Sequence, residues 1–579
     1  MDGTRPDHLT WRHRAFVIVL ALMMAGLALR LAQIQIIDHD RYVEEAAFTR
    51  YGAASVVAPR GAIVDATGYP LATSIDTWDV YLDSFLWRDR ELAAEAATEL
   101  AAALGLDAAE VLATGTRQDR GDVVLLRELP YEAGLELQRR GLWGVRTLPG
   151  SIRIYPEGDL ASQLIGYVGL DGNGLWGIEA DYDHELRGRP GRLVVESDPL
   201  GRPIAFTQRA ARAPEAGGEV HLTVDRFIQA IVERHLDAAL DQFESPSGSI
   251  VVMDPHTGAI LALASRPATA LAPSSLQLPQ EELASLVRNR AVTDLYEPGS
   301  VFKTLTAAAA IDLGRVTPDS TYVDEGKVEI GGFTINNWNF TAYGEVTVTE
   351  LLQRSLNTGA VWLSEEIGPR DFYRYITAFG IGELTHVGLS GEAEGIIRTP
   401  DDEDWYPVDL ATNSFGQGLA ATPLQVLTAI NVFANGGSLM RPYVVSRIVT
   451  EDSVREFDPV TVRRVVSPAT ARTMARLMLD VVEGVAWHGA RVPGYRVAGK
   501  TGTTIVSVPT GYDFDTTIAS FAGFLPYEQP RISILVKIDQ PGGERNLGGE
   551  VAAPVFSGVA ADIMEYLNEP AGQLRAAAP

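Results

Sequence analysis

A long apolar run lies near the start of the chain and predicts a membrane helix. Residues 15–29 are apolar without interruption, and residues 31–37 continue the run after Arg30, which matches the roughly 20 residues that a helix needs to span a bilayer. Arg12 and Arg14 precede the run and acidic residues follow it, so the positive-inside tendency predicts a cytoplasmic N-terminus. A cleaved signal peptide is the alternative, but no convincing cleavage site of small residues follows the run.

The rest of the chain changes its pattern near residue 220. Before that point short strand-like runs alternate with Ala-rich helical ones, such as 93–104, and Gly and Pro interrupt both. After it, residues 226–243 repeat apolar side chains at helical spacing, with Thr223 and Asp225 as candidate N-caps. Residues 247–265 then form two apolar runs joined by a turn-rich segment, which is typical of a β-hairpin.

The C-terminal part completes an α+β pattern. Residues 518–524 and 531–539 predict further core strands, and 553–567 predicts a closing amphipathic helix. This pattern of elements predicts an antiparallel sheet with helices packed against it. The predicted segments are a cytoplasmic tail (1–14), a transmembrane helix (15–37), an elongated mixed domain (38–220), an α+β domain (221–570) and a C-terminal tail (571–579).

Composition narrows the class of protein. The 579 residues are 46% hydrophobic and 8% aromatic, which fits two or more folded domains. The formal net charge of -27 argues against nucleic acid as a partner, because phosphate binding needs concentrated Lys and Arg. The chain has no Cys, which excludes disulfides and thiol chemistry but leaves the compartment open. Its His residues form no HExxH motif or triad-like pair, so we expect no metal or cofactor.

Two Gly-rich segments imitate nucleotide-binding motifs. Residues 494–501, GYRVAGKT, match the phosphate-binding pattern GxxxxGK[ST], so a nucleotide hydrolase is a second hypothesis. That loop requires a helix directly after its Lys, whereas residues 502–511 are β-branched and Gly-rich and predict a strand. Residues 172–177, GNGLWG, match GxGxxG, but the helix candidate 178–186 is short for a dinucleotide-binding crossover. Tight turns explain these glycines better.

A third motif set points to a serine nucleophile. In 297–305, EPGSVFKTL, Ser300 precedes Lys303 by one helical turn, so both side chains rise from the same face. Alone, this Ser reads as a helix cap and this Lys as a solvated side chain. Ser355-Leu356-Asn357 and Lys500-Thr501-Gly502-Thr503 follow downstream. The order S-x-x-K, S-x-N, K-T-G is the set found in penicillin-binding proteins and class A β-lactamases.

These residue types suit acyl transfer. A Ser hydroxyl needs a base, and Lys303 can serve only when its amine is neutral, which burial and a neighbouring cation such as Lys500 favour. Ser355 can relay a proton, and the Asn357 amide can hold a peptide bond because it both donates and accepts hydrogen bonds.

The segment after Lys500 is the predicted substrate-binding strand. Lys500, Thr501 and Thr503, with Gly502 between the two threonines, would hold a terminal carboxylate. The backbone N–H groups of Ser300 and Thr503 would form an oxyanion hole.

The chain resembles class B penicillin-binding proteins over nearly its whole length. The resemblance rests on eight segments: PRGAIVDATGYPLA (59–72), RIYPEG (153–158), GLWGIE (174–179), VVMDPHTGAILALAS (251–265), YEPGSVFK (296–303), SFGQGLAATPLQ (414–425), AGKTGT (498–503) and AAPVF (552–556). It implies a single transmembrane helix, a pedestal domain of the dimerisation type over 38–220, and a transpeptidase domain whose central antiparallel sheet is flanked by helices.

The resemblance also implies a reaction and its partners. Ser300 would attack the D-Ala-D-Ala bond of a peptidoglycan stem peptide, release the terminal D-Ala, and pass the acyl group to an amine of a neighbouring stem. β-Lactams would acylate the same Ser. No glycosyltransferase domain is evident, so polymerisation would fall to a membrane glycosyltransferase of the shape, elongation, division and sporulation family. The catalytic domain would lie outside the cytoplasmic membrane, and the family likeness favours a role in division over one in elongation.

Three rival functions share parts of this pattern. In a D,D-carboxypeptidase water replaces the acceptor amine, and a β-lactam-hydrolysing or β-lactam-sensing relative would not need the large pedestal. A scaffold without activity is expected to have lost at least one motif, and none is broken.

Overall fold

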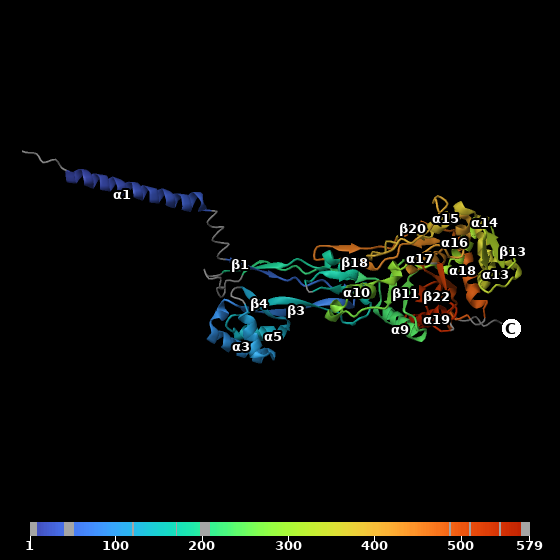
Figure 1. Cartoon of the computed structure of the whole chain (residues 1–579), viewed down its shortest axis with the longest axis horizontal. Coiled ribbons are helices and arrows are strands. Elements are labelled where there is room, and N and C mark those ends of the chain that lie inside the picture. Colours follow the sequence, from blue (N-terminus) through green and yellow to red (C-terminus); the bar gives the residue numbers. More distant parts are fainter. Residues whose placement is uncertain are drawn as a thin grey trace, which may run out of the picture. The chain divides into compact units, whose positions relative to one another are not determined.

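The structure is a computed structural model of the chain, which describes residues 8–39, 51–117, 121–169, 171–196, 209–485, 488–508, 511–543 and 546–568 (Figure 1). It divides into two compact units. Unit 1 comprises Met1–Pro59, Asp76–Ile152 and Gly188–Ala216; unit 2 comprises Arg60–Ile75, Arg153–Arg187 and Gly217–Pro579. The chain enters unit 2 three times, so the domain boundary near residue 220 stays a prediction.

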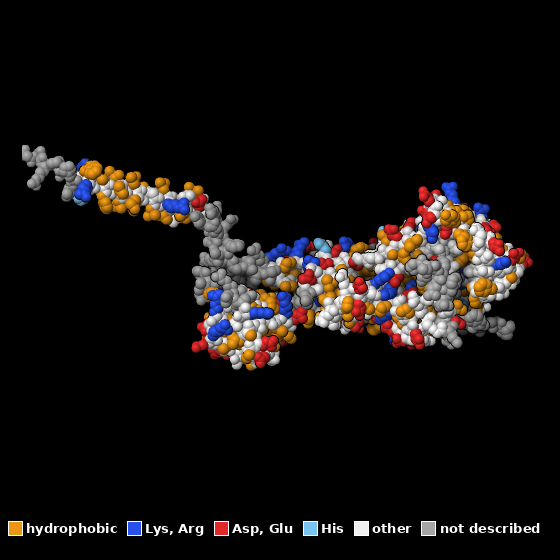
Figure 2. Space-filling model, in the orientation of Figure 1, with side chains coloured by type: hydrophobic (Ala, Val, Ile, Leu, Met, Phe, Trp, Pro, Cys, Tyr) orange, Lys and Arg blue, Asp and Glu red, His pale blue; other side chains and the backbone are white. Residues whose placement is uncertain are grey.

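The N-terminal apolar run is a helix. α1 (His8–Ala32) continues as the π-helix η1 (Gln33–Ile37). Its span Trp11–Ile37 has a mean hydropathy of 2.4 and is not buried in the protein, so it is long and apolar enough to cross a membrane. Figure 2 shows hydrophobic side chains along this helix, with Arg or Lys near each end.

Unit 1 packs short helices beside short antiparallel sheets. Its elements are η2 (Leu86–Arg88), α3 (Arg90–Leu104), α4 (Ala108–Gly115), α5 (Tyr131–Arg140), β1 (Tyr51–Val56), β4 (Asp122–Pro130), β5 (Val145–Ile154), β8 (Gly191–Glu196) and β9 (Arg209–Arg212). β8 pairs with β1 and β9, while β4 and β5 pair with β3 (Pro70–Asp83), which begins in unit 2. The core centres on the fully buried Trp87, whose indole N–H donates to the Trp143 carbonyl.

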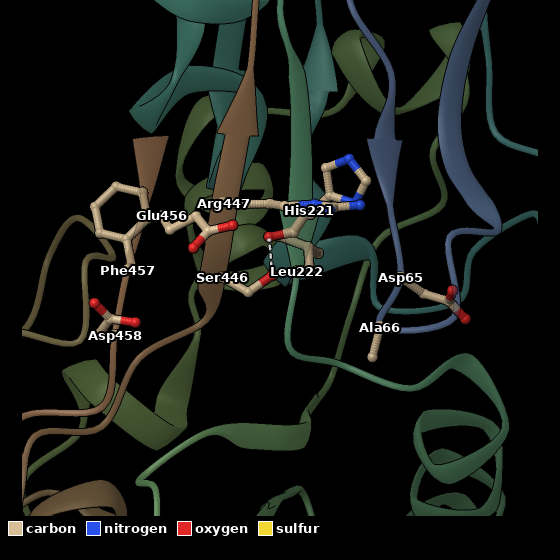
Figure 3. Close-up of a pocket in the computed structure, with 9 residues that line it drawn as sticks. All are labelled: Asp65, Ala66, His221, Leu222, Ser446, Arg447, Glu456, Phe457 and Asp458. Carbon is tan, nitrogen blue, oxygen red and sulfur yellow. Dashed lines mark hydrogen bonds between the residues drawn. The ribbon is translucent and has the colours of Figure 1, made fainter. Parts of the chain in front are cut away.

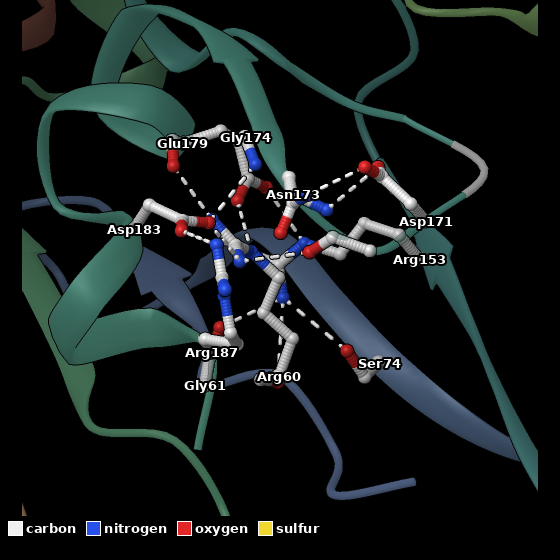
Figure 4. A network of polar contacts seen from close by, with 11 residues as sticks. Arg60, Gly61, Ser74, Arg153, Asp171, Asn173, Gly174, Glu179, Asp183 and Arg187 are labelled. Carbon is white, nitrogen blue, oxygen red and sulfur yellow. Dashed lines mark hydrogen bonds and ion pairs between the residues drawn. The ribbon is translucent and has the colours of Figure 1, made fainter. Parts of the chain in front are cut away.

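The N-terminal segments of unit 2 meet at one buried carboxylate. Glu179 accepts from Arg60 Nε at 2.6 Å and from Arg153 Nε at 2.7 Å, and Arg60 also binds Asp183 at 2.7 Å (Figure 4). The Glu179 side chain is fully buried. Three of the segments that carry the family resemblance, near residues 60, 153 and 179, are therefore held together by ion pairs in the interior.

The rest of unit 2 is built on a five-stranded antiparallel sheet in the order β12-β11-β23-β22-β21. Its strands are β11 (Ser247–Met253), β12 (Ile260–Arg266), β21 (Ala498–Val508), β22 (Gly511–Leu525) and β23 (Ile532–Asp539). β11 and β12 form the predicted hairpin, and both predicted C-terminal strands are present. The prediction of an α+β fold with an antiparallel sheet is confirmed.

Helices cover both faces of this sheet (Figure 1). α9 (Arg226–Gln242) and α19 (Ala552–Tyr566) pack on one face, where alternate strand residues such as Ile250, Phe521 and Val536 join their core. α17 (Pro423–Ala434), buried along its whole length, contacts the sheet from the other side. Asp225, one of the two predicted candidates, is the N-cap of α9. The hydroxyl of the other candidate, Thr223, donates to the Ile260 carbonyl instead.

The remaining strands of unit 2 are short and belong to other sheets, and its remaining helices have up to 16 residues. The strands are β2 (Ile63–Val64), β6 (Tyr167–Val168), β7 (Gly174–Trp176), β10 (Glu219–Leu222), β13 (Thr321–Asp324), β14 (Lys327–Ile330), β15 (Phe333–Asn336), β16 (Gly344–Thr347), β17 (Ser438–Met440), β18 (Val445–Val449), β19 (Val454–Glu456) and β20 (Thr461–Arg464). The helices are α6 (Ser162–Ile165), α7 (Gly177–Asp181), α8 (Asp183–Leu186), η3 (Pro273–Gln277), α10 (Gln280–Val287), α11 (Arg290–Thr293), η4 (Gly299–Val301), α12 (Lys303–Asp312), α13 (Val348–Arg354), α14 (Asn357–Ile367), α15 (Pro369–Ala378), α16 (Pro407–Asn413) and α18 (Pro468–Glu483).

Both nucleotide-binding imitations have a structural explanation. Lys500 lies inside the strand β21, so no helix N-terminus follows it to bind a phosphate. In the GxGxxG match, Gly172 and Gly177 have φ of 78° and 64° and make tight turns, and the helix that follows, α7, has five residues. These local structures support neither nucleotide binding nor a dinucleotide crossover.

Candidate active site

The candidate nucleophile lies in a tight turn before a buried helix. Ser300 is in the 3-10 turn η4, and α12 begins at Lys303. Gly299 has a φ of 57°, and a Cβ there would lie 2.4 Å from Thr504 Oγ1, so only Gly fits this turn. The loop after α16 also lies against this turn, because the Gly299 N–H donates to the Gly416 carbonyl at 3.0 Å. Ser300 is therefore held against both β21 and the loop after α16.

Lys303 lies where a proton from Ser300 can reach it. Its Nζ is 3.0 Å from Ser300 Oγ, 2.6 Å from the Ser355 carbonyl and 2.7 Å from Asn357 Oδ1. The residue is fully buried. Burial, followed by the nearby charge of Lys500, holds the pKa of Lys303 well below its usual value. A neutral amine next to the hydroxyl is the state that a general base requires.

Ser355 joins the two buried lysines. Its Oγ lies 3.3 Å from Lys303 Nζ and accepts from Lys500 Nζ at 3.0 Å. Ser355 ends α13 with a φ of 57°, a left-handed conformation that a non-Gly residue seldom adopts. Burial lowers the pKa of Lys500 to about 7. Hydroxyl and amine groups thus form a continuous chain from Ser300 through Lys303 and Ser355 to Lys500, along which a proton can move.

Asn357 is held by contacts that its own motif does not contain. Its Nδ2 donates to the Asn336 carbonyl at 2.8 Å, while its backbone N–H donates to Asn337 Oδ1 at 3.0 Å. Asn337 is 1% exposed and also accepts from the Thr358 N–H, so it caps α14 from a distant segment. The sequence analysis missed Asn336 and Asn337, because a pair of Asn residues after a short strand reads as a turn.

The strand β21 presents the third motif. A Cβ at Gly502 would lie 2.4 Å from Ser520 Oγ and 2.7 Å from the Pro298 carbonyl, so Gly lets the nucleophile turn pack against this strand. Thr501 Oγ1 lies 3.3 Å from Lys500 Nζ. Thr503 Oγ1 accepts from the Gly548 N–H at 2.9 Å, which ties it to the loop before α19. Both threonines are partly exposed.

Glu297 is a third residue that the sequence analysis did not assign. Its side chain accepts from the Gly418 N–H at 3.0 Å, and its carbonyl accepts from Thr504 Oγ1 at 2.9 Å. The residue therefore links the nucleophile turn to the loop after α16 and to β21. Glu297 lies within the resemblance segment 296–303, but its position directly before a Pro-Gly pair predicts only a turn.

Two surface cavities lie apart from these residues. One, of about 390 Å³, is lined by Asp65, Ala66, His221, Leu222, Ser446, Arg447, Glu456, Phe457 and Asp458 (Figure 3). The other, of about 580 Å³, is lined by residues of α18 and of the segments at 318–319 and 349. Neither lining includes Ser300 or its contacts. The chemistry therefore points to the Ser300 cluster and not to these two cavities.

The predicted site residues converge in space. Ser300, Lys303, Ser355, Asn357 and Lys500 are joined by contacts of 2.7–3.3 Å, although they come from segments up to 200 residues apart. The arrangement offers two hydroxyls, two amines with lowered pKa values and a carboxamide in one place. Such a set can carry out acyl transfer through a serine ester.

Comparison with known proteins identifies two family domains in this chain. Residues 248–565 match the family described as penicillin binding protein transpeptidase domain, and residues 55–222 match the penicillin-binding protein dimerisation domain. Stage V sporulation protein D of Bacillus subtilis is 32% identical over 97% of this chain and 87% of its own length. Peptidoglycan D,D-transpeptidase FtsI of Escherichia coli is 31% identical over 97% of this chain and 93% of its own.

Solved structures agree with this assignment. A peptidoglycan synthetase from Bifidobacterium adolescentis has a TM-score of 0.75 at 27% identity, covering 91% of this chain and 98% of its own. Penicillin binding protein 3 from Mycobacterium tuberculosis, complexed with aztreonam, has a TM-score of 0.69 at 27% identity, covering 90% and 98%. The chain belongs to the penicillin-binding protein transpeptidase family, with a catalytic transpeptidase domain preceded by the family's dimerisation domain.

Proposed function

We propose that this protein is a peptidoglycan D,D-transpeptidase in which Ser300 is the nucleophile. The observation that carries the proposal is the chain of contacts from Ser300 through Lys303 and Ser355 to Lys500. The relative from Escherichia coli, which bears the name of this activity, aligns over nearly the whole chain.

The reaction has two halves. Ser300 Oγ attacks the carbonyl carbon between the two D-Ala residues of a stem peptide, and its proton moves to neutral Lys303. The C–N bond breaks, Ser355 delivers a proton to the departing D-Ala amine, and an ester remains on Ser300. An acceptor amine then attacks the ester carbon and gives its proton back through Ser355. The Ser300 hydroxyl is restored and a new amide bond joins the two stems.

The other site residues bind the substrate and its transition state. The ammonium of Lys500 and the hydroxyls of Thr501 and Thr503 hold the terminal carboxylate, with Gly502 allowing close approach of the strand. The backbone N–H groups of Ser300 and Thr503 stabilise the oxyanion, an element whose loss costs about 100- to 1,000-fold in rate. Asn357 orients the peptide bond of the donor by exchanging a contact it now makes with Lys303 or Asn336.

Gel labelling of the full chain with a fluorescent penicillin tests the nucleophile. We expect Ser300→Ala to abolish covalent label and Lys303→Ala to slow labelling by at least about 100-fold, because the base is lost. Ser249→Ala is the matched control, since it removes a buried hydroxyl of β11 outside the site. Label persisting on Ser300→Ala would refute the assignment.

Product analysis separates cross-linking from its rivals. With a stem pentapeptide and an amine acceptor, a transpeptidase forms a cross-linked dimer, whereas a D,D-carboxypeptidase yields free tetrapeptide alone. Rapid release of hydrolysed penicillin from the labelled protein would indicate a β-lactamase.

The apolar helix serves, in this proposal, as a single membrane anchor over about residues 15–37. The N-terminus lies in the cytoplasm and residues from about 38 onward lie on the outer side of the cytoplasmic membrane, the pedestal over 38–220 and the transpeptidase domain over 221–570. A membrane glycosyltransferase of the shape, elongation, division and sporulation family supplies the glycan strands. Copurification of this glycosyltransferase with the chain, compared between the full chain and a form without residues 1–37, tests that partnership.

A further inference from the structure

Two aromatic side chains lie exposed beside the second catalytic motif. Trp338 is 60% and Phe340 79% exposed, in the loop that follows β15. Single exposed aromatics are common on protein surfaces, but a neighbouring pair next to catalytic groups indicates a binding surface.

The loop that carries them is rigidly held. Asn337, directly before Trp338, is buried and donates to both oxygens of Asp324 at 3.0 Å while it caps α14. The Phe340 N–H donates to the Asn337 carbonyl at 3.0 Å, and Phe340 has a φ of 55°. A bulky residue adopts this left-handed backbone only where its surroundings enforce it. The backbone that carries the two rings is therefore preorganised, which lowers the entropic cost of binding.

The same loop is continuous with the catalytic groups. Trp338 Nε1 donates to the Arg354 carbonyl at 3.1 Å, one residue before Ser355. Asn336, on the other side of Asn337, accepts from the Asn357 amide. The exposed indole thus adjoins the segment that supplies Ser355 and Asn357.

The reaction determines which substrate approaches on this side. Ser355 gives a proton to the departing amine in the first half-reaction, so by microscopic reversibility it receives one from the arriving amine in the second. Both amines must therefore reach the carbonyl carbon on the side of Ser355. The departing amine belongs to a small D-Ala, whereas the arriving amine belongs to a long side chain of a second stem peptide, which needs a surface to rest on.

We propose that Trp338 and Phe340 form a subsite for the acceptor stem peptide. The methylene chain that carries the acceptor amine packs on these rings, and the ring faces attract the amine while it is still charged. The charged amine first releases one proton to solvent. The neutral amine then attacks the ester carbon and passes a second proton to Ser355, which relays a proton through Lys303 to Ser300 Oγ as the bond from the ester carbon to Ser300 Oγ breaks. This inference rests on the proposed function.

Acceptor transfer can be measured apart from acylation. The full chain in detergent is given a stem pentapeptide as donor and a stem tetrapeptide with a free side-chain amine as acceptor. We expect Trp338→Ala to lower the ratio of cross-linked to hydrolysed product about tenfold, the effect of losing contact with one or two methylene groups. The apparent KM for the acceptor should rise correspondingly, and Trp338→Phe, which keeps a ring face, should restore part of the ratio.

Controls distinguish this subsite from other roles of the loop. Tyr406→Ala removes an aromatic ring that is 62% exposed, at the N-cap of α16, and should leave the ratio unchanged. The rate of fluorescent-penicillin labelling, measured on each variant, reports the first half-reaction. An equal loss of labelling and transfer in Trp338→Ala would overturn the proposal, because the loop would then act on the nucleophile.

Two further results bear on the outcome. An unchanged product ratio in Trp338→Ala and Phe340→Ala would also overturn the subsite and leave the rings to a partner protein or a glycan strand. Failure of the proposed function itself would appear separately, as label that persists on Ser300→Ala.

Discussion

At the scale of single residues, the environment of two lysines sets the chemistry. Lys303 and Lys500 are both buried, and burial disfavours the charged ammonium in each case. In the proposed mechanism the two side chains have opposite tasks, since Lys303 must be neutral to accept a proton while Lys500 must be charged to hold a carboxylate. Their shared link, Ser355, couples the titration of one to that of the other.

This arrangement predicts a bell-shaped pH dependence for acylation by a carboxylate-bearing β-lactam. The rate rises as Lys303 loses its proton, well below the usual pKa of a lysine. It falls as pH increases through about 7, because Lys500 then loses the charge that attracts the carboxylate. The second-order labelling rate between about pH 5 and pH 10 measures both limbs in the free enzyme.

Lys500→Arg tests the assignment of the alkaline limb. A guanidinium stays charged over this range, so we expect the decline above pH 7 to disappear while the acid limb remains, or moves to lower pH because the nearby positive charge is permanent. Arg441, an exposed cation outside the site, offers the control Arg441→Lys, with an unchanged profile. An alkaline limb that persists in Lys500→Arg would assign it to another group.

At the scale of elements, a few buried polar contacts fix how the segments meet. Asn337 caps α14 from a loop 20 residues away, and Glu297 joins the nucleophile turn to the loop after α16. In the N-terminal part of unit 2, Glu179 gathers Arg60 and Arg153. In each case a side chain satisfies donors that would otherwise be buried without a partner.

The Glu179 cluster is expected to be essential for stability. Glu179→Ala leaves two buried guanidinium groups without their main acceptor, so the free energy of unfolding should fall by about 3–5 kcal/mol. Thermal unfolding of the detergent-solubilised full chain measures the change. Glu329→Ala is the control: it removes an exposed carboxylate 3.8 Å from Lys327, a type of pair that contributes at most about 1 kcal/mol. Equal stability of the two variants would show that Asp183 compensates for the loss.

At the scale of the whole molecule, one apolar helix and two compact units share the chain. The helix is long enough to span a bilayer, and the basic residues Arg12 and Arg14 precede it. The basic side favours the cytoplasm, so in the proposed topology both units lie outside. This orientation agrees with a reaction on the cell wall.

The absence of Cys from the chain allows a clean test of this orientation. Single substitutions Thr4→Cys and Val454→Cys introduce one thiol each, the second at a position that is 59% exposed. On intact cells or spheroplasts, a membrane-impermeant maleimide should label Val454→Cys and leave Thr4→Cys unlabelled until the membrane is permeabilised. The reverse pattern would invert the topology.

Local patterns in the sequence determined much of this protein. Periodicity gave the apolar helix, the hairpin of β11 and β12, the C-terminal strands and α19, because side-chain spacing reports directly which face is buried. The motifs gave Ser300, Lys303, Ser355, Asn357 and Lys500 as candidates, because acyl transfer needs those residue types. The strand character of the residues after Lys500 also separated this chain from nucleotide hydrolases, because a phosphate-binding loop requires a helix at that point.

Only the tertiary structure decided how these pieces meet. The contacts of Asn337 with Asn357, of Glu297 with Gly418 and of Glu179 with Arg60 join segments that no local spacing relates. The lowered pKa values of Lys303 and Lys500 likewise arise from burial by distant elements. The physical reason is that periodicity records the surroundings of a residue along its own helix or strand, whereas burial, pairing of charges and the exposure of Trp338 depend on which segments pack together.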